Sequence, residues 1–120
     1  MLETLQPKCT CPAYPPYHTG KYLEEYFFDY YQRNIDRFEK LDRKYIPVFW
    51  TNCYNNGVLP EWGDKINPFH MQQQLNTLDM NDNYFTVCQH DDASMHQIPT
   101  KTVLFSAGGN VKTPTTVPIP

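Results

Sequence analysis

Residues 84–92 read YFTVCQHDD, and this stretch decides how the chain is interpreted. The run at 84–89 is aromatic and β-branched, which is typical of a buried strand, and it stops at polar side chains. A second run of the same kind, YIPVFWTN, occupies residues 45–52. Pro47 marks its start or an unpaired edge, because proline cannot donate to a strand ladder. Both runs are therefore predicted to be strands.

A helix signal lies between these two predicted strands. Asn67 is a good N-cap and Pro68 suits the first helical position, while Met71, Leu75 and Leu78 form one apolar stripe. The turn-rich residues 52–67 are predicted to be a long loop. The crossover at 45–89 is long enough for parallel pairing, so these two strands are expected to be parallel neighbours or near-neighbours.

The flanking segments extend the pattern on both sides. A helix is expected from about Thr19, with an apolar stripe through Phe27 and with Glu24 and Glu25 favourable to the helix dipole. It either continues past Asn34 or breaks there. Residues 101–107 read as a third strand, and no further element is expected from Thr113 onward. The predicted class is α/β, a Rossmann-like three-layer sandwich with a mostly parallel sheet.

Composition narrows the possible functions. The net charge is −3 without a basic stripe, which gives no nucleic-acid footprint, and no apolar run reaches the ~18 residues of a membrane span. Aromatic residues make up 15 % of the chain, including nine tyrosines. Tyrosine-rich surfaces bind polyols or peptides, although a tyrosine-rich core is the structural alternative. Localisation stays open between the cytoplasm and a membrane-anchored parent protein.

The four cysteines do not form a recognisable metal or redox motif. Cys9 and Cys11 have C-x-C spacing, unlike the C-x-x-C of zinc and redox sites. Cys53 and Cys88 stand in apolar surroundings, as small core residues do. A disulfide framework is not expected, since no secretory signal is present in the chain.

Polar residues follow each predicted strand, and the carboxyl ends of parallel strands meet at one edge, where ligands bind in open α/β sheets. His90 and Asp91 are the candidate catalytic residues, since a histidine or a carboxylate can act as a base on a hydroxyl. Carboxylates, amides, aromatic faces and a glycine turn suit a polyol. The candidate substrate-binding residues are Trp50, Thr51, Asn52, Tyr54, Gln89, Asp92, Gly108, Gly109 and Asn110.

Structural explanations exist for several of these residues. Asp92 suits a cap of the following turn, His90 suits a hydrogen-bonded structural residue, and Gly108-Gly109 needs only a tight turn. A metal site is not expected, because His70 and His96 lack diagnostic spacing relative to His90.

Four phrases in this order resemble the exostosin-like glycosyltransferases: PAYPPYHTGKYLEEYFFDYY, RKYIPVFWTNCYNN, NYFTVCQHDD and LFSAGGN with a later VPIP. The resemblance spans about residues 12–120, and none of its phrases is a catalytic signature. It implies a GT-B fold, of which this chain is the N-terminal, acceptor-side half. It also implies transfer of a sugar from a nucleotide-sugar donor to a glycan acceptor.

We expect a Pro/Tyr-rich lead-in at 1–18, whose prolines disfavour a helix, a partial Rossmann-like domain at 19–112 and a proline-rich link at 113–120. The resemblance implies that the middle part is the acceptor-side domain. The family's donor-binding residues have no counterpart here, so a missing C-terminal domain is expected to hold the nucleotide sugar. No cofactor is expected in this segment, and it is not expected to be active alone. The alternatives are a non-catalytic carbohydrate- or peptide-binding module and a metal-dependent hydrolase using His90, Asp91 and Asp92.

Overall fold

The computed structural model describes residues 3–6, 22–58, 68–90, 96–107 and 116–118 of the chain. Its sheet contains β1 (Lys44–Tyr45), β2 (Tyr84–Cys88), β3 (Thr102–Ser106) and β4 (Thr116–Pro118). The strands lie in the order β1-β2-β3-β4 and every pairing is parallel. The protein is therefore an α/β protein, and the predicted parallel pairing of the first two strands is confirmed.

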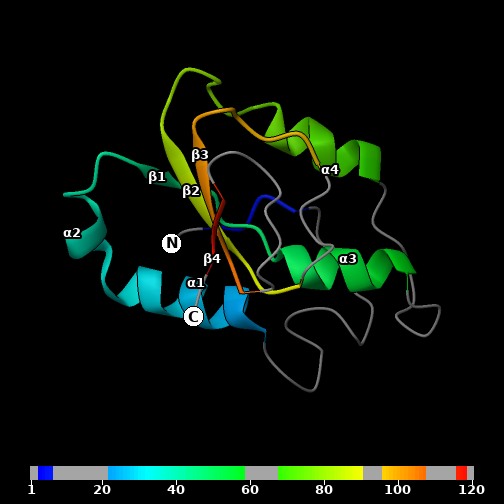
Figure 1. Cartoon of the computed structure of the whole chain (residues 1–120), viewed down its shortest axis with the longest axis horizontal. Helices are drawn as coiled ribbons and strands as arrows, with labels where there is room; N and C mark the ends of the chain where they lie inside the picture. The colour runs from blue at the N-terminus through cyan, green and yellow to red at the C-terminus, as the bar shows by residue number, and fades with distance from the viewer. Residues whose placement is uncertain (1–2, 7–21, 59–67, 91–95, 108–115, 119–120) are drawn as a thin grey trace.

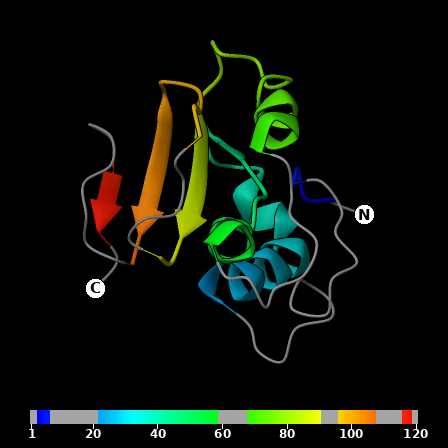
Figure 2. The same cartoon turned by 90° about the vertical axis from the view of Figure 1, so that its right-hand side faces the viewer.

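Helices lie on both sides of this sheet (Figures 1 and 2). On one side are α1 (Leu23–Arg33) and the short α2 (Ile35–Phe38), and on the other are α3 (Trp50–Val58) and α4 (Pro68–Leu75). The first helix breaks at Asn34, as one of the two sequence alternatives proposed. The Asn34 side chain donates to the Tyr30 carbonyl (2.8 Å), which satisfies an orphan carbonyl at the helix end.

The alternation of side chains along β2 assigns its two faces. Thr86 receives a hydrogen bond from Trp50 at the start of α3, whereas Phe85 packs against Phe27 of α1. Because successive residues point to opposite faces, Tyr84, Thr86 and Cys88 face α3 and α4 while Phe85 and Val87 face α1. All five residues are buried, as expected for a parallel strand covered on both sides.

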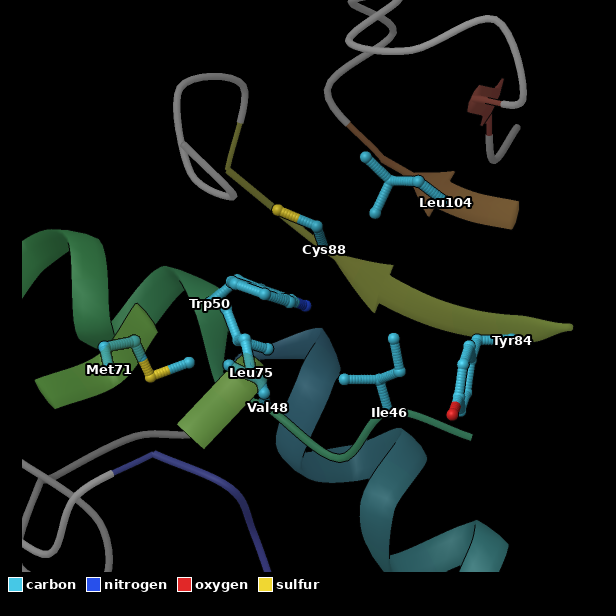
Figure 3. Packing of buried hydrophobic residues seen from close by; sticks show 8 residues of the cluster. All are labelled: Ile46, Val48, Trp50, Met71, Leu75, Tyr84, Cys88 and Leu104. Atoms are coloured by element: carbon cyan, nitrogen blue, oxygen red, sulfur yellow. The ribbon is translucent and has the colours of Figure 1, made fainter. Parts of the chain in front are cut away.

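The face toward α3 and α4 holds the main hydrophobic core (Figure 3). Its buried members are Ile46, Val48, Trp50, Met71, Leu75, Tyr84, Cys88 and Leu104. Inside it, the Trp50 indole donates to the Thr86 hydroxyl (2.8 Å), which in turn donates to the Ile46 carbonyl (2.9 Å). This chain of bonds satisfies the indole N–H, the hydroxyl and the carbonyl that it joins, and it fixes α3 against β2.

The opposite face is filled by aromatic rings. Phe85 lies in contact with Phe27, Phe38 and Tyr45, with ring centroids 6.0, 6.1 and 5.4 Å apart. Tyr31 joins the same cluster, with its ring 4.7 Å from that of Tyr45. Offset and edge-to-face ring pairs of this kind add stabilisation beyond their buried area. The aromatic cluster therefore holds α1 and α2 on β1 and β2.

This aromatic cover stops short of β3. Thr102, Leu104 and Ser106 are buried on the α3/α4 side, whereas Val103 and Phe105 on the α1 side are only half-buried. An apolar groove of about 690 Å³ opens there, between β2, β3 and the α1–α2 segment. Val103 and Phe105 are therefore the least covered residues of β3 on this face.

The prediction of one continuous strand over residues 45–52 is wrong. The strand ladder ends when the Ile46 N–H donates to the Phe85 carbonyl (2.9 Å), and Trp50 already begins α3. Pro47 has no N–H with which to continue pairing, and the Val48 N–H turns back to the Ile46 carbonyl (3.1 Å). Residues 52–58, predicted as loop, belong to α3, while residues 59–67 lie outside the described part.

Three other boundaries differ from the sequence-based expectations. The first helix begins at Leu23, and Thr19 lies outside the described residues. The predicted helix over 68–78 ends at Leu75, although Leu78 still packs against the core. A strand, β4, lies within 113–120, where no element was expected, and it pairs with β3 from Leu104 to Ser106. A three-residue run containing proline carries almost no strand signal, and proline is tolerated at a sheet edge.

We predict that Phe85→Ala lowers the free energy of unfolding by ~3–5 kcal/mol, because it removes the ring at the centre of the aromatic cluster. Urea unfolding followed by tryptophan fluorescence measures this loss. The control Met80→Ala removes a side chain that is 52 % exposed and is expected to change the value by less than ~0.5 kcal/mol. Equal losses in both variants would contradict the assigned packing.

Candidate functional site

The carboxyl ends of β2 and β3 meet the first turns of α1 and α3, and this junction is the candidate site. Cys88 and Ser106, the last residues of β2 and β3, are paired in register, and the Ala107 N–H donates to the Cys88 carbonyl (3.0 Å). Gln89 and His90 follow β2 directly. The ends of parallel strands thus bring polar groups to one edge, as the sequence predicts.

His90 is held at this edge by α3. Its backbone N–H donates to the Thr51 hydroxyl (3.0 Å), and its ring lies against that of Tyr54, with centroids 4.5 Å apart and planes 30° from parallel. Both side chains are half-buried. The predicted proximity of His90 to Thr51 is therefore confirmed, and His90 and Tyr54 together present a partly exposed aromatic surface.

Gln89 connects the same edge to α1. Its side chain is exposed, and its Oε1 accepts a hydrogen bond from the Leu23 N–H (2.6 Å), one of the free amides at the start of the helix. The first turn of α1 is thereby placed beside the end of β2. This placement brings Glu24 and Glu25 into the junction.

Glu24 is a buried carboxylate that caps a distant helix. Its side chain is 1 % exposed, and Oε2 accepts a hydrogen bond from the Thr51 N–H in the first turn of α3 (2.7 Å). Burial raises the pKa of Glu24 above its usual range, while hydrogen bonds from the Thr51 hydroxyl and from the N–H groups of Thr51, Glu24 and Gln89 oppose that rise. Desolvation is the larger effect.

Glu25 makes a second bridge between the same two helices. Its Oε2 accepts from the Asn52 side-chain amide (3.0 Å) and from the Tyr22 backbone N–H (3.3 Å). The second bond is the carboxylate half of a capping box, which helps α1 to begin at Leu23. Two consecutive carboxylates of α1 therefore meet two consecutive residues of α3.

The other residues predicted for the site divide into two groups. Trp50 is 1 % exposed, with its indole N–H bonded to Thr86, so the aromatic surface at this edge comes from Tyr54 and His90. Thr51 and Asn52 are also 1 % exposed, and their polar atoms bond to Glu24, His90 and Glu25. The remaining candidates, Asp91, Asp92, Gly108, Gly109 and Asn110, lie outside the described residues.

Sequence reasoning missed Glu24 and Glu25 as members of the site, because acidic residues in a first turn are explained by the helix dipole alone. A signal was present. Glu24 stands four residues before Phe28 and seven before Tyr31, which puts it on an inward-facing stripe of the helix. Phe28 indeed packs against Phe49 beside the start of α3, with ring centroids 5.4 Å apart.

Within the described residues, no group of three or more His, Cys, Asp and Glu side chains is placed to hold a metal ion. Neither Cys53 nor Cys88 forms a disulfide within the described residues, and Cys88 is buried in the core as predicted. No helix in the described part of the chain is long and apolar enough to cross a membrane.

Comparison of the chain with models of protein families, with curated proteins and with solved structures gives no match. The functional assignment therefore depends on the geometry of this edge and on the resemblance of the sequence phrases.

We predict that Glu24→Gln stabilises the protein relative to the wild type at neutral pH but less so at low pH. A raised folded-state pKa means that the contribution of Glu24 to stability is complete below its unfolded pKa and is lost as the pH rises through the folded value. Glutamine keeps the oxygen that accepts from Thr51 and carries no charge. Urea unfolding of both proteins from pH 3 to 8 tests this, and an advantage that shrinks with rising pH would contradict it.

Proposed function

We propose that this chain binds a glycan at the carboxyl edge of its sheet and forms the acceptor-side part of an exostosin-like glycosyltransferase. The observation that carries the proposal is the contact of His90 with Thr51 and Tyr54, which joins polar groups and an aromatic surface at the edge where α/β proteins bind ligands. The sequence phrases quoted above supply the resemblance to this family, and function is otherwise not implied by fold.

The chemistry of the edge suits a sugar ring. Sugars present C–H surfaces that pack on aromatic faces and hydroxyls that hydrogen-bond to amides and carboxylates. His90 and Tyr54 offer the ring surface, the exposed Gln89 offers an amide, and Asn55 lies half-buried one residue beyond Tyr54. These groups lie on elements fixed by the buried core, which pre-orders them for binding.

In this proposal the domain is Rossmann-like, a three-layer sandwich that forms the N-terminal half of a GT-B fold. The helices on both faces of the parallel sheet support that arrangement. A nucleotide-sugar donor binds to a C-terminal domain that these 120 residues do not supply. His90 or Asp91 is the proposed base toward the acceptor hydroxyl, acting only when the donor domain is present.

We predict that neutral and acidic oligosaccharides from a mixed panel shift the amide resonances of Thr51, Tyr54 and His90 in ¹⁵N-labelled protein, and that nucleotide sugars do not. His90→Ala is expected to weaken the best-binding oligosaccharide about twofold to tenfold, which is the range for loss of one aromatic contact. Its melting temperature should change little, because alanine keeps the backbone N–H that bonds to Thr51.

His70→Ala is the matched control, since this exposed histidine lies on α4, outside the candidate site. If no oligosaccharide binds, or if binding shifts residues far from this edge, the proposal is wrong. Sugar transfer by the chain alone from a nucleotide sugar would also overturn its acceptor-side assignment. Binding that persists without transfer when the donor domain is supplied would favour the non-catalytic carbohydrate-binding alternative.

A further inference from the structure

The apolar groove on the α1 side of the sheet is not explained by the packing of the fold. Its floor consists of residues that are paired in register, Phe85 and Val87 of β2 with Val103 and Phe105 of β3, so the groove runs along the two strands. Its apolar walls come from α1, α2 and the residues that follow, namely Leu23, Phe27, Phe38 and Leu41. A mainly apolar hollow of about 690 Å³ has the size and lining of a small-molecule site.

The charged residues that line the groove, Asp42 and Arg43, lie at the end where the strands begin. Arg43 Nη1 donates to the carbonyl of Tyr84, the first residue of β2 (3.1 Å), and to that of Lys101, just before β3 (2.7 Å). These bonds hold the guanidinium across the amino ends of both strands. Its Nε and Nη2 atoms make no hydrogen bond within the described residues, so their N–H groups are open to a ligand.

The groove favours a single hydrocarbon chain over a segment of protein. A hydrocarbon needs no hydrogen-bond partner, whereas an extended peptide brings an N–H and a C=O with every residue, which apolar side chains cannot satisfy. A helix satisfies its own backbone, but with side chains it is about 10–12 Å wide and would lie over the groove rather than inside it. At the charged end, the fixed fork of Arg43 matches the two oxygens of a carboxylate.

We propose that the groove binds a single-chain anionic amphiphile of the fatty-acid class, with its hydrocarbon chain along β2 and β3 and its carboxylate on Arg43. The inference does not rest on the proposed glycan binding, whose residues His90 and Tyr54 meet at α3 rather than at α1. Asp42 repels an anion at the same end of the groove, so the charges of Arg43 and Asp42 together set the affinity.

Chain length and head group test the two parts of this site separately. Isothermal titration of octanoate, decanoate and dodecanoate below their micelle concentrations measures the dissociation constant and the stoichiometry. One molecule should bind per chain, and each added CH₂ that enters the groove should tighten binding by up to about fourfold. Decanoate should bind about tenfold more tightly than decanol, because the alcohol lacks the charge-assisted bonds to Arg43, and decylamine should bind more weakly still.

Arg43→Gln should remove the preference for decanoate over decanol, whereas Asp42→Asn should tighten decanoate about twofold, as loss of an exposed like charge does. The matched control is Arg37→Gln, because Arg37 is an exposed arginine of α2 that does not line the groove. It should leave the affinity within about twofold of the wild type.

Val103→Trp tests the groove without touching Arg43, whose bonds to two carbonyls also support the fold. The indole should fill part of the hollow and weaken decanoate at least about tenfold, with little change in melting temperature because Val103 is only half-buried. The proposal is wrong if decanoate does not bind, if acid, alcohol and amine bind equally, or if Val103→Trp leaves the affinity unchanged. A dimer that Val103→Trp dissociates in sedimentation, without decanoate binding, would instead make the groove an interface between copies of the chain.

Discussion

The hydrogen bond from the Thr51 N–H to the Glu24 carboxylate is the contact on which the arrangement of the two helix layers depends. The bond lies at the carboxyl edge of the sheet. It joins α1, which covers one face, to the first turn of α3, which covers the other. The free amides at a helix start need acceptors, and here the acceptor comes from a residue 27 positions away. The position of α3 sets that of Trp50, and the hydrogen bond from Trp50 to Thr86 in turn fixes the core against β2.

The two faces of the sheet are stabilised by different interactions, and they differ in how completely side chains cover them. The α3/α4 face combines aliphatic packing with a fully bonded Trp50–Thr86–Ile46 chain, so disturbing one member leaves a buried polar group unpaired. The α1 face depends on aromatic rings that reach β1 and β2 but leave Val103 and Phe105 of β3 half-covered. At the carboxyl edge polar groups from α1 and from α3 are bonded to one another, and the candidate site lies there.

Local signals explain which parts of the fold were predictable from the sequence. The β2 and β3 runs and the Asn-Pro start of α4 are decided by residues close in sequence, and all three elements are present. Residues 45–52 have strand composition, yet tertiary contacts override it: Pro47 ends the pairing and Glu24 supplies the cap that α3 lacks locally. A helix whose capping group comes from another helix cannot be predicted from a local sequence pattern.

The predicted meeting of His90 and Thr51 was correct although Thr51 was assigned to the wrong type of element. The reason is topological. A chain leaving β1 at its carboxyl end reaches the same edge as the end of parallel β2, whether its next residues are strand or helix. Side-chain roles do not follow from topology in this way, so Glu24 was explained by the helix dipole until its burial was known. The burial of this carboxylate and its bond to the Thr51 N–H show that it builds the edge at which α1 and α3 meet, which a charge placed only for the helix dipole would not do.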